Sequence, residues 1–193
     1  LRSQIAELPR IRLVNLPTPL AEMRRLSELL GGPRLWIKRD DLTGLAFGGN
    51  KERKMEFAMA DAVSKGADTV ITTGPLQSNH SRATAAAARK VGLKAVLVLR
   101  GTEPAEYDGN LLLDSLLGAD IRFVQVDWRQ VGPKLEAVAK ELKKSGRTPY
   151  IIPGGASYPI GAVAYVNAVA ELLEQAMDAN LKIDCVVHAA GSG

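Results

Sequence analysis

The sequence predicts an α/β protein with open, twisted parallel sheets and helices on both sheet faces. Short runs of almost continuous apolar residues alternate with helical segments along most of the chain, as in the Ala-Val-Leu-Val-Leu run of residues 95–99. Such runs are typical of strands that are buried on both faces of a parallel sheet. Polar or glycine-rich turns follow several of them, at the edge where parallel sheets bind ligands. Functional side chains are therefore expected in the loops that follow the strands.

The elements can be assigned in chain order from apolar periodicity and turn residues. Residues 16–32 open with Leu-Pro-Thr-Pro, and Thr18 could cap a helix there that two glycines end. Another helix is expected to begin at Asn50, a residue type that often caps helices, and to end at Gly66. Strands are expected at 35–38, 69–73, 95–99, 121–126, 148–152 and 183–189. Further helices are expected at 79–91, 109–117, 134–144 and 159–177.

The composition is that of an ordinary globular protein. The chain has 193 residues, 46% hydrophobic and 24% charged, which is enough for one or two domains. The net charge of +4 comes from cations scattered among acids, and aromatics make up only 5%, so nucleic-acid binding is not supported. No apolar run of transmembrane length and no signal peptide is found, so a cytoplasmic location without a membrane partner is expected. The single cysteine, Cys185, lies in an apolar run and is expected to be a buried thiol.

The most unusual stretch is Gly-Leu-Ala-Phe-Gly-Gly-Asn-Lys-Glu-Arg-Lys-Met-Glu-Phe at residues 44–57. Three cations, Lys51, Arg53 and Lys54, fall in the first turns of the expected helix, where the positive end of the helix dipole disfavours them. The arrangement is reasonable if Lys51 carries no free charge, or if an anion binds at this helix end. A lysine in imine linkage with a cofactor aldehyde, beside the cofactor's phosphate, would meet both conditions. A solvated basic helix start is the alternative.

A second informative site is the loop after the second expected strand. Gln77, Ser78, Asn79 and His80 are four consecutive hydrogen-bonding side chains at a strand-to-helix turn. A helix cap needs one such residue, which Ser78 or Asn79 could supply, so four of them favour a ligand-binding loop. His80 is expected to be a hydrogen-bonded positioning residue rather than a general base. The second histidine, His188, falls in the last expected strand and is interpreted as a core residue bonded to a backbone group.

Two glycine-rich turns follow later strands, Pro-Gly-Gly-Ala-Ser at residues 153–157 and Gly-Ser-Gly at residues 191–193. Turns of this kind can present backbone N–H groups to an anion, although each alone is weak evidence. The spacing of a dinucleotide or Walker motif is missing, as is the Gly-x-Ser-x-Gly elbow of serine hydrolases. No metal-ligand spacing is found either, so no metal site is expected.

Four motifs together resemble one family: GGNK followed by RK, then QSNH, then PGGAS, then a strand ending in GSG. In this order and spacing they are similar to D-cysteine desulfhydrases and 1-aminocyclopropane-1-carboxylate deaminases. These are pyridoxal 5'-phosphate (PLP) enzymes of fold type II, the fold of the tryptophan synthase β subunit. The resemblance covers essentially the whole chain, and the GGNK and QSN motifs together are quite specific.

The resemblance implies roles for individual residues. Lys51 would form the imine with the cofactor, and Ser78 would share its catalytic role. Lys54 would help to hold the phosphate, and Asn79 would bond the phenolic oxygen of the ring. The implied cofactor-binding residues are Lys51, Lys54, Asn79, Gly191, Ser192 and Gly193. The implied substrate-binding residues are Asn50, Gln77, Ser78 and His80.

The residue after QSN separates the two activities within this family. His80 favours a D-cysteine desulfhydrase, which eliminates across the α- and β-carbons to give pyruvate, ammonia and hydrogen sulfide. The alternative is a 1-aminocyclopropane-1-carboxylate deaminase, which opens the ring to give 2-oxobutanoate and ammonia. A hypothesis from another class is a non-catalytic Rossmann-like nucleotide-binding module. That module predicts no carbonyl-reactive lysine, and hence no yellow colour that borohydride abolishes.

The resemblance also implies two domains, with residues 51–165 forming the smaller one around a four-stranded parallel sheet. Residues 1–50 and 166–193 would form an incomplete part of the larger, PLP-binding domain. The chain is then expected to be part of a protein of roughly 320–340 residues, a homodimer when full length and inactive as this piece alone. Apolar surface that a longer chain would cover is expected near Cys185, Val186 and Val187.

Overall fold

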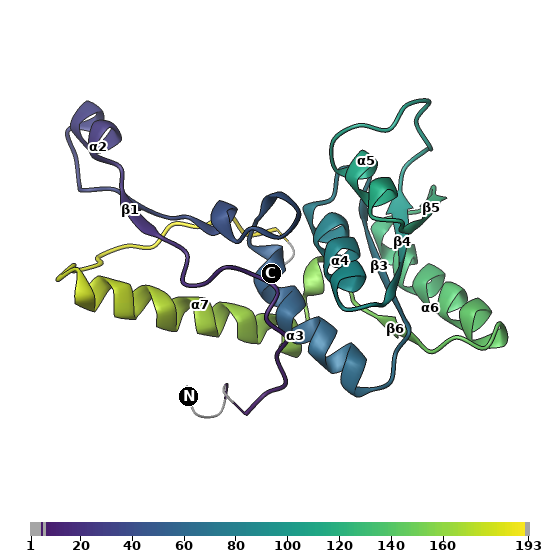
Figure 1. Cartoon of the computed structure of the whole chain (residues 1–193). Helices are drawn as coiled ribbons and strands as arrows, with labels where there is room; N and C mark the ends of the chain where they lie inside the picture. Colours follow the sequence, from purple (N-terminus) through teal and green to yellow (C-terminus); the bar gives the residue numbers. More distant parts are fainter. Residues whose placement is uncertain (1–4, 6, 192–193) are drawn as a thin grey trace.

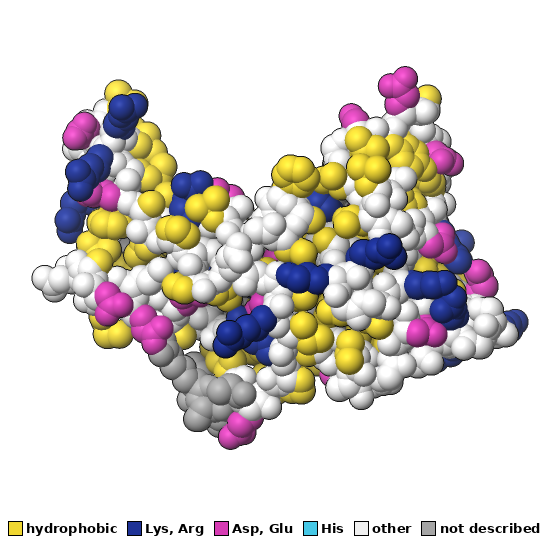
Figure 2. Space-filling view, in the orientation of Figure 1, with side chains coloured by type: hydrophobic (Ala, Val, Ile, Leu, Met, Phe, Trp, Pro, Cys, Tyr) yellow, Lys and Arg dark blue, Asp and Glu magenta, His cyan; other side chains and the backbone are white. Residues whose placement is uncertain are grey.

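The computed structural model of the protein describes residue 5 and residues 7–191, and they form two lobes (Figure 1). The sheet lobe contains strands β3 to β6 with helices α4, α5 and α6. The hairpin lobe contains strands β1 and β2, helix α2 and the C-terminal part of helix α7. Helix α3, Lys51–Ser64, lies between them and contacts both α4 and α7. On the face shown in Figure 2, the surface is hollowed between the lobes.

The sheet lobe confirms the predicted parallel sheet. Its four strands are β3 Thr69–Pro75, β4 Lys94–Arg100, β5 Asp120–Val124 and β6 Pro149–Ile151. They are ordered β5-β4-β3-β6, and every pairing is parallel. The carboxyl ends of all four strands therefore meet at one edge, which is where the loops with the candidate residues begin.

Helices cover both faces of this sheet, as predicted. Val70 and Leu97 point into a core with α3, α4 Asn79–Lys90 and α5 Gly109–Leu116. Ile71 and Val98, their neighbours along the strands, point to the other face against α6 Trp128–Lys144. Because successive side chains of a strand alternate between faces, a sheet covered on both sides needs apolar residues at every position. The continuous apolar runs of the sequence have this cause.

The N-terminal region differs from its prediction. The helix expected within residues 16–32 is only Arg24–Leu30, α2, and it is preceded by a short strand, β1, Leu20–Glu22. This strand pairs antiparallel with β2, Trp36–Lys38. Thr18 is not a helix cap, because its hydroxyl donates to Asp40 Oδ1 at 2.8 Å. Pairing with β2 satisfies the backbone hydrogen-bonding groups of residues 20–22. The apolar periodicity of residues 16–32 does not reveal this distant partner.

Two later assignments also needed correction. Helix α6 begins at Trp128 rather than at residue 134, and Pro133 lies inside it. No strand forms at residues 183–189, where the backbone has no ladder partner within the described part of the chain. Helix α7, Pro159–Asp178, agrees with its prediction and precedes this segment, which runs back toward the helix's N-terminus (Figure 1). None of the helices in the described residues is both long enough and apolar enough to cross a membrane.

Side chains of the segment after α7 lie on the surface. Cys185 is exposed, so the prediction of a buried thiol is wrong. His188 is exposed as well, and although its Nδ1 lies 3.4 Å from the carbonyl oxygen of Ala189, it is not a core residue. Without a neighbouring strand, nothing among the described residues covers these side chains. The expected apolar surface is present, with Val186 at 62% exposure and Val187 at 91%.

Candidate active site

The glycines before Lys51 shape a tight loop that delivers the lysine to the start of α3. Gly48 has φ 73° and Gly49 has φ 137°, in the region that favours glycine. A Cβ on Gly48 would also collide with the carbonyl oxygen of Asp41. Thr43 closes the loop, because its Oγ1 accepts from the backbone N–H of Gly49 at 2.8 Å. The double glycine is therefore required for backbone geometry close to the candidate lysine.

Asn50 does not cap α3, contrary to its prediction. Its backbone is helical and its side chain makes no capping hydrogen bond. Instead, the Asn50 amide nitrogen donates to the hydroxyl of Tyr165, which lies on α7. The interaction between these helices draws the side chain away from the helix end, so Asn50 does not use the first N–H groups of α3. Tyr165 is a site residue that the sequence analysis missed.

Lys51 and Lys54 are two amines in neighbouring positions with different surroundings. Lys51 is half-buried, and burial lowers the pKa of its amine. Its Nζ makes no hydrogen bond or ion pair with any residue described by the structure. Lys54 is buried and donates to the carbonyl oxygen of Gly155 at 3.0 Å. Burial lowers the Lys54 pKa and the charge of Lys51 lowers it further.

These surroundings suit carbonyl chemistry at Lys51. An amine attacks a carbonyl carbon only in its neutral form, and a lowered pKa increases the fraction that is neutral. The repulsion between the two ammonium groups would be relieved either by imine formation at one of them or by a bound anion. The residues present therefore fit a phosphate-bearing aldehyde.

The structure shows Ser78 as the N-cap of helix α4. Its Oγ accepts from the backbone N–H of Ser81 at 3.1 Å, and its φ and ψ are extended. The capping alternative left open by the sequence is therefore correct for Ser78. Ser78 is 7% exposed and lies at the C-terminal end of β3, where a Cβ on Gly74 would collide with its side chain. The cap does not test the predicted catalytic role.

Gln77 and Asn79 flank Ser78 and contact the start of α5. The Gln77 amide is fully used there, because its Oε1 accepts from Asn110 N at 2.8 Å and its Nε2 donates to Asp108 Oδ1 at 2.8 Å. The Asn79 Oδ1 accepts from Asn110 Nδ2 at 3.0 Å. Asn110 was not predicted from the sequence, and its only signal was the Asp-Gly-Asn run at the start of the expected helix. The direct substrate contact expected of Gln77 remains a prediction.

His80 is buried and neutral. The Thr72 hydroxyl donates its proton to the carbonyl oxygen of Ile152 at 2.8 Å, so the 2.7 Å contact with His80 Nε2 must be a bond donated by the imidazole. Burial, followed by the charges of Lys51 and Lys54, lowers the His80 pKa to about 3. A group with so low a pKa remains unprotonated near neutral pH, which suits a positioning role better than proton transfer.

The structure describes the first of the two glycine-rich turns in full and only Gly191 of the second. The turn at residues 153–157 contains a short 3-10 helix, Gly154–Ala156, whose carbonyl groups face Lys54. Gly191 is exposed at the end of the described chain, and Ser192 and Gly193 lie outside the described residues. The predicted phosphate loop at Gly191 to Gly193 therefore remains a prediction.

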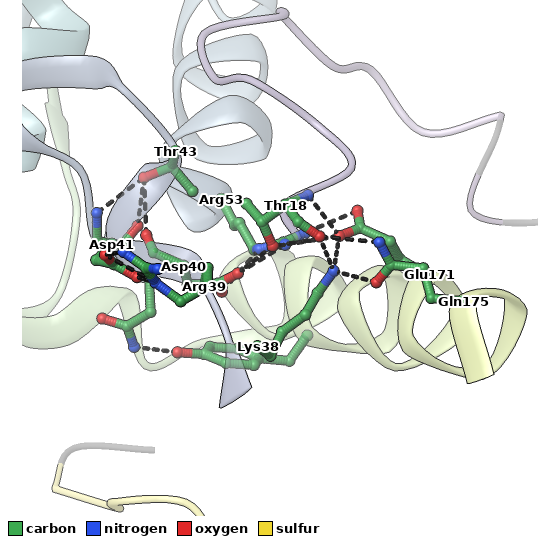
Figure 3. A network of polar contacts seen from close by, with 12 residues as sticks. Thr18, Lys38, Arg39, Asp40, Asp41, Thr43, Arg53, Glu171 and Gln175 are labelled. Atoms are coloured by element: carbon green, nitrogen blue, oxygen red, sulfur yellow. Dashed lines mark hydrogen bonds and ion pairs between the residues drawn. The ribbon is translucent and has the colours of Figure 1, made fainter. Parts of the chain in front are cut away.

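A charge network around the buried Arg53 holds the loop before Lys51 against α7 (Figure 3). The Arg53 Nη2 lies 2.8 Å from Asp40 Oδ1 and 2.9 Å from Glu171 Oε1. Lys38 reaches the same carboxylate at 2.5 Å. Burial alone would raise the pKa of Glu171, but hydrogen bonds from Arg53 and Lys38 lower it to about 2. Arg53, two residues after Lys51, thus links the helix that carries the lysine to the segment around Asp40 and to α7.

A second buried cluster lies beside the first turn of α3. Arg82 on α4 donates to the Gly48 carbonyl oxygen at 2.7 Å and forms an ion pair with Glu52 at 3.2 Å. Burial raises the Glu52 pKa to about 7, although the charge of Arg82 opposes the shift. Burial also raises the pKa of Asp114 on α5 to about 7. Periodicity could not reveal this cluster, because its members come from three helices.

Comparison with known proteins identifies relatives over almost the whole chain. The chain is 48% identical over 191 residues to a putative 1-aminocyclopropane-1-carboxylate deaminase of Pyrococcus abyssi (strain GE5 / Orsay), covering 98% of this chain and 57% of the relative. It is 42% identical over 199 residues to a D-cysteine desulfhydrase of Serratia proteamaculans (strain 568), covering 100% of this chain and 59% of the relative. The chain thus spans less than two thirds of the length of these two proteins.

A solved structure has the same fold. The crystal structure of an ACC deaminase homologue superposes with a TM-score of 0.84 at 46% identity, over 90% of this chain and 53% of that one. A T.th. threonine deaminase shares the fold at a TM-score of 0.66 and 24% identity, over 86% of this chain and 48% of that one. The family described as pyridoxal-phosphate dependent enzyme matches residues 11–193. The chain therefore belongs to the pyridoxal-phosphate dependent enzymes, whose cofactor is pyridoxal phosphate.

Proposed function

We propose that the intact protein is a PLP-dependent lyase acting on a small amino acid, and that this chain supplies its lysine. The observation that carries the proposal is the environment of the Lys51 amine. This lysine is half-buried with a lowered pKa, lacks a partner among the described residues, and follows a glycine loop at the start of a helix. Neither a nucleotide-binding module nor a solvated basic helix start needs an amine of this kind.

Each site residue has its own proposed role toward the cofactor or the substrate. When bound, pyridoxal phosphate supplies an electron sink for the charge left at the substrate's α-carbon. Lys51 would hold the cofactor, and its amine, once free, would take the proton from the substrate's α-carbon. Lys54 supplies positive charge toward the phosphate, and Asn79 an amide toward the ring. Ser78 and Asn50 lie at the ends of the two helices that would face the substrate.

Between the two activities we propose D-cysteine desulfhydrase first. Elimination of the thiol from D-cysteine, followed by addition of water, gives pyruvate, ammonia and hydrogen sulfide. His80, directly after Gln-Ser-Asn, supports this choice. The putative deaminase from Pyrococcus abyssi, at 48% identity, supports the second candidate, ring opening of 1-aminocyclopropane-1-carboxylate. Assay of the intact protein with both substrates separates the candidates by product, because only one yields sulfide and only the other yields 2-oxobutanoate.

Replacing His80 with glutamine should shift the preference of the intact enzyme toward the cyclopropane substrate. Since the imidazole is buried and bonded to Thr72, its effect would pass through the neighbouring Ser78 and Asn79. A shift of about tenfold in the ratio of the two kcat/KM values is expected for a change of one contact of this size. The ratio is measured from competing substrates. An unchanged ratio would remove the reason for ranking the desulfhydrase first.

Ser78→Ala should affect stability and turnover separately. Loss of the cap on Ser81 N should lower the free energy of unfolding by about 1 kcal/mol, measured in urea. If Ser78 also contacts the substrate, kcat per folded molecule should fall while cofactor affinity is unchanged. Ser64→Ala, which removes an exposed hydroxyl from α3, is the control. Normal turnover per folded molecule in Ser78→Ala would leave only the capping role.

We also propose that the lobes are parts of two domains, with residues 51–165 forming the smaller one and residues 1–50 and 166–193 belonging to the larger. The parallel sheet and the helices that cover it support this division. Helix α7 runs across the proposed boundary, and α3 contacts elements on both sides of it. The amine of Lys51 would then lie at the junction of the two domains.

A further inference from the structure

The start of helix α5 makes a dense set of contacts with the loop that carries Ser78. The centre of this set is Asn110. Its backbone N–H donates to Gln77 Oε1 at 2.8 Å, and its Nδ2 donates to the Gln77 carbonyl oxygen at 3.0 Å and to Asn79 Oδ1 at 3.0 Å. Gly109 makes room for the approach, because a Cβ there would lie 2.5 Å from Gln77 Oε1. Asn110 therefore holds both residues that flank Ser78.

The orientation of the Asn110 amide is fixed by Arg82. A guanidinium group only donates hydrogen bonds, so the Asn110 atom that faces Arg82 Nη1 at 3.2 Å must be the oxygen. The nitrogen of Asn110 must then face the opposite way, toward Asn79, and Asn79 must present its oxygen to it. We call this chain of contacts, from Arg82 through Asn110 to Asn79, the relay. Each side chain in it determines the orientation of the next.

Arg82 is itself held firmly. It is 7% exposed, and its Nη2 donates to the Gly48 carbonyl oxygen at 2.7 Å and to Glu52 Oε1 at 3.2 Å. The guanidinium cannot turn without breaking these bonds to the loop before Lys51 and to α3. The relay therefore begins at the lysine loop and ends at the side chain of Asn79.

The relay leaves one group of Asn79 available. Its Oδ1 is occupied by Asn110, and its Nδ2 has no acceptor among the residues described by the structure. Asn79 is exposed at the first position of α4, so that nitrogen can reach a ligand. A free amide could turn either its oxygen or its nitrogen toward a ligand, and only the nitrogen can bond an anionic oxygen.

We infer that Asn110 is a positioning residue, which with Arg82 orients the Asn79 amide so that its nitrogen donates to an anionic oxygen of the ligand. Within the proposed function, on which this inference rests, that oxygen is the phenolate of pyridoxal phosphate. Asn110 touches neither cofactor nor substrate and acts only through Asn79. The relay spares Asn79 the cost of selecting one of two amide orientations when the ligand binds.

Replacing Asn110 with aspartate in the intact holoenzyme tests the inference with almost no change of shape. One carboxylate oxygen still accepts from Arg82, but the other now offers an acceptor to Asn79, which should turn its nitrogen inward. The cofactor phenolate then loses a donor and becomes more basic, so the lysine-linked imine should keep its proton to higher pH. The pH at which the visible absorbance band is lost should rise by about one unit, the worth of a hydrogen bond to a charged group.

Controls separate the amide orientation from the added charge. Asn180→Asp makes the same change at an exposed position outside this cluster and should leave the titration unchanged. In an Asn79→Ala background, Asn110→Asp should cause no further shift, whereas a direct effect of its charge would persist there. If Asn110→Asp does not fold, Asn110→Ala removes the donor without adding a charge and should shift the titration in the same direction.

The outcomes distinguish this inference from the proposed function. A shift in Asn110→Asp that is absent in the Asn79→Ala background supports the relay. A titration shifted by Asn79→Ala but not by either Asn110 variant overturns the relay and leaves the role of Asn79 intact. If Asn79→Ala itself causes no shift, the proposed contact of Asn79 with the phenolate is wrong, and the relay falls with it.

Discussion

Lys51→Ala should abolish both the visible absorbance of the cofactor-bound intact protein and its turnover. The variant lacks the only amine in the site that combines partial burial with the absence of a partner among the described residues. Without it, the aldehyde lacks the unpartnered amine with which to form an imine, because the Lys54 amine is buried and donates to the Gly155 carbonyl oxygen, and the α-proton has no tethered base. Loss of general-base catalysis alone should reduce kcat by about 10³-fold. Absorbance spectra and single-turnover kinetics measure the two effects.

The same helix offers a matched control for this result. Lys65 follows the last turn of α3, is exposed and pairs with Asp61 at 2.8 Å. Lys65→Ala should therefore keep the absorbance band and the activity. Reduction of the unmodified protein with borohydride, followed by peptide mapping, should place the cofactor on Lys51. A band that survives Lys51→Ala, or an adduct mapped to Lys54, would contradict the assignment.

Arg53→Met should give the largest loss of stability among the variants considered. It removes the guanidinium shared by Asp40 and Glu171 and leaves both carboxylates in a largely buried place without their main partner. Breaking a buried pair in this way should lower the free energy of unfolding by about 3 kcal/mol or more. Urea denaturation of the intact protein measures the loss.

Arg122 provides a control, because it also pairs with two carboxylates but is more exposed to solvent than Arg53. It pairs with Asp120 and Glu141 at 2.9 and 2.8 Å, and both carboxylates are at least half exposed. Arg122→Met should cost about 1 kcal/mol or less. Equal losses in the two variants would mean that burial of the Arg53 network does not matter.

The Arg53 network should also make stability depend on pH in the acid range. The pKa of Glu171 is lowered to about 2 from the 4.5 of a free glutamate. The stabilisation is then fully present above pH 4.5 and is lost as the pH falls toward 2, because the unfolded chain binds the proton first. The difference in stability between the unmodified protein and Arg53→Met should therefore shrink on acidification.

What the sequence could predict was determined by local pattern. The sheet strands, helix α7 and the loops after β3 and β6 follow from apolar runs and turn residues that are adjacent in the chain. The glycine pair before Lys51 was informative for the same reason, because its backbone requirement is local. Ser78 was identified as a possible cap, and the structure shows it in that role.

What the sequence could not predict depends on contacts between distant residues. Arg53 meets Glu171 across 118 positions, and Arg82 meets Asn110 across 28. The strand at residues 20–22 forms only because Trp36–Lys38 lies beside it, and the apolar pattern of residues 183–189 has no such neighbour in the described chain. Pairing of this kind outweighs local propensity and leaves no periodic signal.

The strand order β5-β4-β3-β6 also has a consequence for folding during synthesis. Strand β3 can pair with β4 soon after both leave the ribosome. Its other edge stays unpaired until β6, Pro149–Ile151, is made, because each residue of β6 lies 80 positions after its partner in β3. Helix α3 is covered later still, because α7, which packs against it, is complete only at Asp178. An unpaired central strand is a site where nascent chains associate wrongly. The helix that carries Lys51 is thus made before the strands of the parallel sheet but enclosed only after them.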